Sequence, residues 1–172
     1  GMSAAYTSGV TDFDTYIASN PTHNSNLAVN IWAAEGTTGN IDFDLGGTFT
    51  IESFAFWTGT GATWQGNVVD FMLLADDNAS FSSPVNLGSF TASPIGLITA
   101  IAADVFTFAA TSADFVRMQV TSNSGNIVTY FGEAAFEVPE PATLTLLALG
   151  GRRRTAAAVS ITAELRDRGD DG

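Results

Sequence analysis

Between residues 27 and 138, apolar and polar residues alternate, and turn-forming residues recur every eight to twelve positions. The clearest instance is Ile41, Phe43 and Leu45, which alternate with Asp42 and Asp44. Successive side chains of a β-strand point to opposite faces, so this segment would place its apolar side chains on one face and its carboxylates on the other. A chain built from such segments buries one face of each strand, which favours packed β-sheets over helices.

Further strands are expected along the same stretch of chain. Gly46 and Gly47 predict a turn, and residues 48–58 are rich enough in β-branched and aromatic side chains to predict a strand buried on both faces. The pattern also predicts strands at residues 68–75, 85–91, 105–109, 115–121 and 129–138. Residues 95–103 fit either a helix or a strand, and no stretch before Val138 shows a helical stripe with caps. The expected fold class is all-β, a β-sandwich or jelly roll.

Composition excludes several kinds of chemistry. The chain has 172 residues, 18 acidic and 6 basic, with a formal charge of −12, and all of its basic residues are arginines. Such an acidic surface repels phosphate backbones, which excludes nucleic acid as an expected partner. Without cysteine or lysine, the chain cannot form disulfides, a thiol nucleophile or a Schiff base. Its length and its 45% hydrophobic content suit a single core.

Charge and the positions of the prolines together divide the chain into three segments. Residues 1–151 hold fourteen acids and one base, Arg117, whereas residues 152–172 hold five arginines and four acids. At the junction, Pro139 and Pro141 flank Glu140, and prolines this close end a helix or a central strand. We therefore expect a β-sandwich domain at 1–138, a separate segment at 139–154 and a C-terminal tail at 155–172.

The junction reads VPEPATLTLLALGGRRR over residues 138–154. This string resembles the PEP-CTERM sorting signal of bacterial surface proteins, with its Pro-Glu-Pro motif, hydrophobic span and arginine cluster. The resemblance implies processing by an exosortase during export and transient membrane contact through residues 142–154. The alternative is an ordinary linker followed by a short buried helix or strand at 144–149.

Two features depart from that signal. The apolar run at 142–151 has ten residues, about 15 Å as a helix, whereas crossing a bilayer requires roughly 20. The chain also continues past its arginines, and residues 155–168 predict a short amphipathic helix ended by Gly169. No signal-peptide pattern is present at the N-terminus. Gly1 before Met2 is typical of tag removal, so export would need a signal upstream of Met2.

The body of the chain resembles the discoidin, or coagulation-factor C-type, domains and the related galactose-binding-like carbohydrate modules over roughly residues 20–138. The matching segments, in chain order, read NLAVNIWAAEG, IDFDLGGTFTIESFAFW, VVDFMLLADDNASF, ADFVRMQVTSNSGN and FGEAAFEV. Arg117 and Glu133, in the last two of these segments, occupy positions that match the family's pattern. The resemblance implies a galactose-binding-like jelly-roll β-sandwich, here followed by a short C-terminal non-β tail.

The loop at residues 58–67 is the first candidate ligand site. Sugar recognition uses a flat aromatic face together with groups that bond hydroxyls. Trp64, Gln65 and Asn67 offer an aromatic ring and two amides among flexible glycines. The alternative for Trp64 is a tryptophan folded over the end of the sandwich as a lid.

Two other loops carry further candidates. Asn123, Asn126 and Tyr130 lie where the resembling carbohydrate modules carry binding residues, although Ser-Asn-Ser-Gly is also a plain turn signal. His23, the lone histidine, falls where those modules place a polar binding residue. The alternative for His23 is a solvated loop histidine, since one imidazole without cysteine or a second histidine makes no transition-metal site.

The resemblance also implies a structural calcium ion beneath the early loop. Asn24, Asn26 and Glu133 are the matching oxygen donors, and the family's acidic loop residue is missing here. Calcium takes six to eight oxygen ligands, so asparagine carbonyls without a second carboxylate bind it only modestly.

Two polar features have structural interpretations. Arg117, the only base in the body, is expected to pair with one of the many acids around it. Asp76, Asp77 and Asn78 predict a hairpin turn, in which Asx side chains cap their own backbone.

Three functions are compatible with these features. The first is an exported, non-enzymatic surface protein that binds carbohydrate or exopolysaccharide through the loops around Trp64. The second is a structural surface or matrix protein with no dedicated ligand pocket, kept soluble by its acidic coat. The third is a hydrolase, which would require two carboxylates facing each other across a sugar. No nucleophile elbow, HExxH motif or phosphate loop is present.

Overall fold

Two long strands, β3 (Gly39–Thr58) and β7 (Asp104–Asn123), pair antiparallel along most of their length and organise the fold. The computed structural model describes residues 2–6, 11–24, 31–59, 66–93, 100–138 and 162–163. The remaining elements are α1 (Phe13–Ala18), β1 (Thr22–Asn24), β2 (Trp32–Glu35), β4 (Val68–Asp76), β5 (Val85–Thr91), β6 (Ala100–Ala102), β8 (Val128–Glu137) and β9 (Thr162–Ala163).

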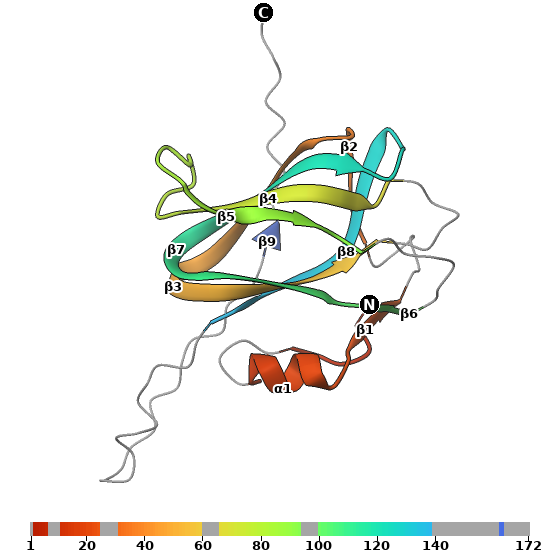
Figure 1. The fold of residues 1–172 in the computed structure, drawn as a ribbon, viewed down its shortest axis with the longest axis horizontal. Coiled ribbons are helices and arrows are strands. Elements are labelled where there is room, and N and C mark those ends of the chain that lie inside the picture. Colours follow the sequence, from red (N-terminus) through yellow and green to blue (C-terminus); the bar gives the residue numbers. More distant parts are fainter. Residues whose placement is uncertain are drawn as a thin grey trace, which may run out of the picture.

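Strands β3 and β7 each belong to both layers of the sandwich. The hydrogen-bonded order is β2-β8-β3-β7-β4-β5, and Figure 1 shows β3 and β7 curving together at one end so that the sheet folds over on itself. Before the bend, residues 39–44 of β3 pair with the second half of β7, which pairs in turn with β4. Beyond it, residues 53–58 of β3 pair with β8. The result is a two-layered jelly-roll sandwich built from one bent sheet.

The prediction of a turn at Gly46 and Gly47 is wrong. Strand β3 continues through both glycines, and its register with β7 shifts between Asp44 and Phe49. Gly46 has a φ of +75°, and its N–H donates to Asp44 Oδ1 at 2.8 Å. A glycine pair inside a strand bends it without ending it. The two strands expected at 105–109 and 115–121 are also one strand, β7, which pairs with β3 on both sides of the bend.

The core between the layers is aromatic. Phe54 is fully buried, and its ring centroid lies 4.9 Å from that of Phe136 and 5.7 Å from that of Phe56. Phe43 and Phe71 meet the Phe54 ring at 6.3 and 6.1 Å. Both halves of β3 contribute to this cluster, so burial of these rings holds the two layers together.

Helix α1 contradicts the prediction that no helix precedes Val138. Its N-cap is Asp12, whose Oδ1 accepts the Thr15 N–H at 2.8 Å, and its buried side chains are Phe13 and Tyr16. These two rings pack with Trp57 against the outer side of the sheet, beneath the lower layer in Figure 1. The helix packs on Ala55 and Trp57 of β3. Residues 53–58 are all buried, which confirms burial on both faces for that part of the predicted strand, whereas Thr48 and Thr50 are exposed.

Three short strands complete the structure. Strands β1 and β6 form a separate two-stranded sheet, so the ambiguous stretch at 95–103 includes a strand at 100–102. Strand β9 pairs with Phe43 and Asp44 of β3. The helix predicted over 155–168 is wrong at Thr162–Ala163, where the free edge of β3 offers backbone hydrogen-bonding groups that a strand can satisfy. The rest of that prediction lies outside the described residues.

Arg117 is paired, as expected. It lies opposite Asp42 in the β3–β7 register and donates to both carboxylate oxygens, from Nε at 2.6 Å and from a terminal nitrogen at 2.7 Å. The hydrogen bonds to Asp42 raise the pKa of Arg117, and the guanidinium lies 4.1 Å above the Phe81 ring centroid. The arrangement ties β3 and β7 to the loop that follows β4.

Replacing Arg117 with methionine should lower the free energy of unfolding by about 1 kcal/mol, because a bidentate, half-buried ion pair exceeds the median surface pair. Chemical denaturation of the wild type, Arg117→Met, Asp42→Asn and the double variant would measure the coupling between the two side chains. Additive effects of the two substitutions would contradict a direct interaction.

The turn between β4 and β5 is also as predicted. Asp76 accepts hydrogen bonds from the Asn78 N–H, the Asn78 side-chain amide and the Ser83 N–H, at 3.2, 2.8 and 3.1 Å. Asn78 in turn accepts the Ser80 N–H at 3.1 Å. These carboxylate and amide groups are occupied in shaping the hairpin.

Candidate functional site

Several loops meet at the end of the sandwich opposite the bend in β3 and β7 (Figure 1). Strand β3 ends there at Thr58, β4 begins at Val68, and the turn between β7 and β8 spans residues 124–127. The turn after β2 joins them, because Gly36 donates its N–H to Ile127 O at 2.6 Å. We call this region the loop end, defined by residues 36, 59, 66–67 and 123–130.

Tyr130 occupies the centre of the loop end. Its ring rests on Gly66, where an added Cβ would lie 2.8 Å from Tyr130 Cδ2 and Cε2 and 2.3 Å from Val128 O. Gly59 is also close to Tyr130, because a Cβ added to Gly59 would lie 3.0 Å from the Tyr130 Cβ. Only glycine allows these approaches, so the two glycines form a bed beneath Tyr130, with Gly66 under the half-buried ring and Gly59 against its Cβ.

Ser124 and Asn67 join the two neighbouring loops. Ser124 Oγ accepts the N–H groups of Gly66 and Asn67 at 2.9 and 3.0 Å, and the Ser124 N–H donates to Asn67 O at 2.9 Å. Tyr130 N–H donates to Gly66 O at 2.7 Å. The Asn67 side chain is 7% exposed, with its Oδ1 against Gly59. The structure thus brings Asn67 and Tyr130 together and fixes the loop ends beside them.

Asn123 and Asn126 lie in the adjoining turn. Asn123 Oδ1 accepts the Gly125 N–H at 3.0 Å, and its amide donates to Asn126 O and Val128 O at 2.9 and 3.2 Å. Asn126 Oδ1 accepts the Ile127 N–H at 2.6 Å. Both groups of the Asn123 amide are used within the turn, so its visible role is to shape the loop beside Tyr130.

Trp64 and Gln65 lie outside the described residues. Their roles remain predictions.

His23 lies elsewhere. The sequence interpretation places it on a loop, whereas the structure places it in strand β1, where it is 1% exposed. Its ring packs on Gly132 of β8, at which an added Cβ would lie 2.7 Å from His23 Nδ1. A ring buried in this way does not reach a ligand at the surface of the loop end, and it is not solvated.

The described residues give little support to the calcium site expected at Asn24, Asn26 and Glu133. Glu133 lies on β8, with Met2, Tyr16 and Trp57 lining the same cavity, and burial raises the pKa of its carboxyl group against the opposing effect of the Ala134 N–H. Asn24 lies in β1, and Asn26 is outside the described residues. Among the residues that the structure describes, no group of three histidine, aspartate or glutamate side chains could hold a metal ion. A single carboxylate against apolar walls does not fit the charged oxygen cage that calcium prefers.

The loop end therefore offers one class of chemistry. A half-buried tyrosine, held on two glycines and flanked by amide side chains, can pack against the apolar face of a sugar ring while neighbouring polar groups meet its hydroxyls. The sequence does not reveal that these glycines contact an aromatic residue, because a glycine required for close packing looks the same as one in a flexible loop. Within the described ranges, no helix has the length and apolarity needed to cross a bilayer.

Comparisons with solved structures support this architecture. A family 32 carbohydrate-binding module of Clostridium perfringens, solved with GalNAc-β-1,3-galactose, superposes with a TM-score of 0.51 and 19% identity, over 62% of this chain and 73% of that one. A fragment of a putative chitobiase from Bacteroides thetaiotaomicron gives 0.53 and 18%, over 82% and 89%. The family 32 module of C. perfringens NanJ, solved with galactose, gives 0.50 and 15%, over 65% and 81%.

At these identities the likeness concerns the fold. It confirms the predicted galactose-binding-like jelly-roll β-sandwich, which the discoidin-like segments of the sequence also indicate. No protein-family model matches the chain, and the search of curated proteins found no match.

Proposed function

We propose that this protein is a non-catalytic carbohydrate-binding module whose site is the loop end. The observation that carries the proposal is the half-buried side chain of Tyr130, with its ring on Gly66 and its Cβ against Gly59, where three loops converge. Aromatic side chains are the usual platforms for pyranose rings, and a platform held by backbone contacts loses little entropy on binding. The fold shared with family 32 modules supports the same location, since ligand sites on sandwiches lie in loops that a rigid sheet positions.

The residues of the site divide by role. Tyr130 supplies the apolar platform, and Asn67 holds the loop ends in register with it. Trp64 and Gln65 are proposed as a second aromatic surface and a hydrogen-bonding amide on the same loop. Asn123 and Asn126 would act by shaping the neighbouring turn.

Electrostatics narrows the class of glycan. Residues 1–151 carry fourteen acids and one base, a net charge of 1 − 14 = −13. A polyuronate would be repelled by such a body, especially at low salt. We therefore expect a neutral glycan, such as one with terminal galactose or N-acetylgalactosamine.

Export forms the second part of the proposal. The Pro-Glu-Pro motif, the apolar run and the arginine cluster at 138–154 support exosortase-type sorting to the cell surface, with transient membrane contact through residues 142–154. Residues 139–161 lie outside the described part of the chain. An exported module of this kind would associate with exopolysaccharide near the cell that secretes it.

Substituting Tyr130 with alanine should weaken binding to a neutral glycan by about ten-fold, because the stacking platform is lost. Affinity electrophoresis against neutral and acidic polysaccharides would measure this, alongside Trp64→Ala. Val85→Ala is a matched control, since Val85 is 52% exposed and lies at the other end of the sandwich, beside the β4–β5 hairpin.

The controls separate the alternatives. Tyr130→Phe should retain most of the affinity, because it keeps the ring. Binding that survives Tyr130→Ala would place the site elsewhere. Failure of the wild type to bind any neutral glycan would favour a structural surface protein with no ligand pocket.

A further inference from the structure

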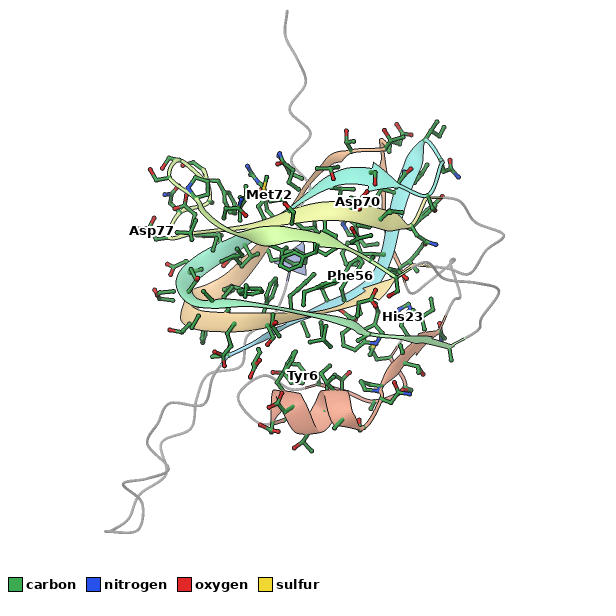
Figure 2. The ribbon with its side chains drawn as sticks, viewed as in Figure 1. Tyr6, His23, Phe56, Asp70, Met72 and Asp77 are labelled. Atoms are coloured by element: carbon green, nitrogen blue, oxygen red, sulfur yellow. The ribbon has the colours of Figure 1, made fainter. Side chains whose placement is uncertain are left out.

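A cavity lies on the side of β8 that faces helix α1, away from the loop end. The cavity has a volume of about 360 Å³ and opens between the N-terminal segment, helix α1 and the strands β3 and β8. Figure 2 shows Tyr6 in this position, between α1 and the lower layer of the sandwich. We call it the underside pocket. Its lining includes Ala5, Tyr6, Tyr16, Trp57, Glu133 and Phe136.

The aromatic wall of the underside pocket is firmly held. The ring centroids of Tyr6 and Tyr16 are 5.0 Å apart, and those of Tyr16 and Trp57 are 6.3 Å apart. Tyr16 donates its hydroxyl to Ala4 O at 3.1 Å, and Trp57 donates Nε1–H to Pro21 O at 2.9 Å. These bonds fix the rings and tie the N-terminal segment over the sheet, so the pocket is largely preformed.

The charged groups in and near the underside pocket are negative. Glu133 is the only carboxylate in the lining, and its Oε1 accepts a long hydrogen bond from the Ala134 N–H, at 3.4 Å. Among the described residues, the only arginine is Arg117, and it is committed to Asp42. Burial raises the pKa of Tyr6, and the negative charges of nearby Glu137 and Asp12 raise it further. No cationic side chain of the described residues therefore lines the pocket.

An apolar pocket with aromatic walls and one carboxylate complements a particular kind of molecule. A cation is attracted to aromatic faces and to a carboxylate, while an attached apolar group gains from burial against the alanines and Phe136. The volume lies within the range of small-molecule sites in proteins. An anion would meet only repulsion there.

We propose that the underside pocket is a second binding site that takes a small organic cation, an ammonium group carried on an apolar or aromatic body. It is separate from the loop end, because it faces the α1 side of β8 and shares no lining residue with the loops around Tyr130.

The test uses three probes of matched size: 2-phenylethylammonium, neutral 2-phenylethanol and anionic 3-phenylpropionate. Calorimetry, together with amide chemical shifts of Ala134 and Ala135, should show that the ammonium probe binds most tightly. Glu133→Gln should weaken the ammonium probe by about five-fold and leave the alcohol unchanged. Glu35→Gln, an exposed carboxylate on β2, is the matched control and should change neither.

A second variant tests the location. Ala5 is exposed at the pocket, so Ala5→Trp should fill the space without burying new polar groups, and it should abolish binding of all probes. Neutral glycan binding should persist in both Glu133→Gln and Ala5→Trp, which separates this proposal from that for the loop end. Equal affinity for the ammonium and the alcohol, an unchanged Glu133→Gln variant, or no saturable binding of any probe would overturn it.

Discussion

Replacing Phe54 with alanine is expected to lower the free energy of unfolding by about 3–5 kcal/mol, the usual cost of deleting a fully buried phenylalanine ring. Phe54 is 0% exposed and lies at the centre of the aromatic cluster, with Phe136 and Phe56 stacked on it at 4.9 and 5.7 Å. Its neighbours come from both layers, so the surrounding strands cannot collapse onto the vacated space without shifting the sandwich.

Urea denaturation followed by tryptophan fluorescence would measure the loss. Val105→Ala is the comparison, because Val105 is 42% exposed on β7 and its truncation should cost less than about 1 kcal/mol. Similar losses from the two variants would mean that the layers do not depend on the Phe54 cluster.

Substituting Gly66 with valine should have the second large effect, on both stability and glycan binding. Gly66 has a φ of +124°, and a Cβ there would lie 2.3 Å from the Val128 carbonyl oxygen, a backbone atom that cannot rotate away. The strain and the clash together should cost about 2 kcal/mol or more. They should also push the loop away from Tyr130 and reduce affinity for neutral glycans at least as much as Tyr130→Ala does.

Gly39→Ala is the matched control. It lies at the start of β3, and a Cβ there would meet nothing within 4 Å. Thermal melts and affinity electrophoresis on both variants would show whether the effect is specific to the glycine bed. A Gly66→Val protein with wild-type stability and binding would show that the bed does not position the site.

Much of the sheet could be predicted because burial on one face leaves a visible period of two. Strand β5 spans the predicted residues 85–91, β4 extends one residue past its predicted end, and β8 begins and ends one residue before its predicted bounds. The bend at Gly46 and Gly47 could not be predicted, because a glycine pair serves equally well in a hairpin turn and in a bent strand. Only the pairing partners distinguish the two cases, and those lie about seventy residues away in β7.

Helix α1 has only a weak signal in the sequence. Asp12 is a good N-cap, and Phe13, Tyr16 and Ile17 follow the spacing of a helical face. Six residues are too few for that period to stand out, and this helix is stabilised by packing against Trp57.

The candidate site was only partly accessible from sequence. Tyr130 and Asn67 do lie together, although Tyr130 lies near the start of strand β8 and not on the loop expected for it, where it forms a bridge with Asn67 just before β4. The resemblance puts His23 at the same end, on a loop. In the structure its ring is buried against β8, because Gly132 has no side chain there, and the sequence around His23 does not reveal this distant glycine. The underside pocket depends on α1 and the N-terminal segment, so the pattern of the strands alone does not reveal it.

The two bent strands have a consequence for the way in which the chain reaches its native state. Every pair across β3 and β7 joins residues far apart in the sequence, as with Asp42 and Arg117, 75 positions apart. The entropy of closing such loops is lost before the contacts that reward it form, which is the situation of slow-folding proteins with high contact order. Because each of these strands runs through both layers, neither layer can be completed first as an independent unit. The sandwich should therefore fold in one slow cooperative step, with the bend at Gly46 and Gly47 formed in that same step.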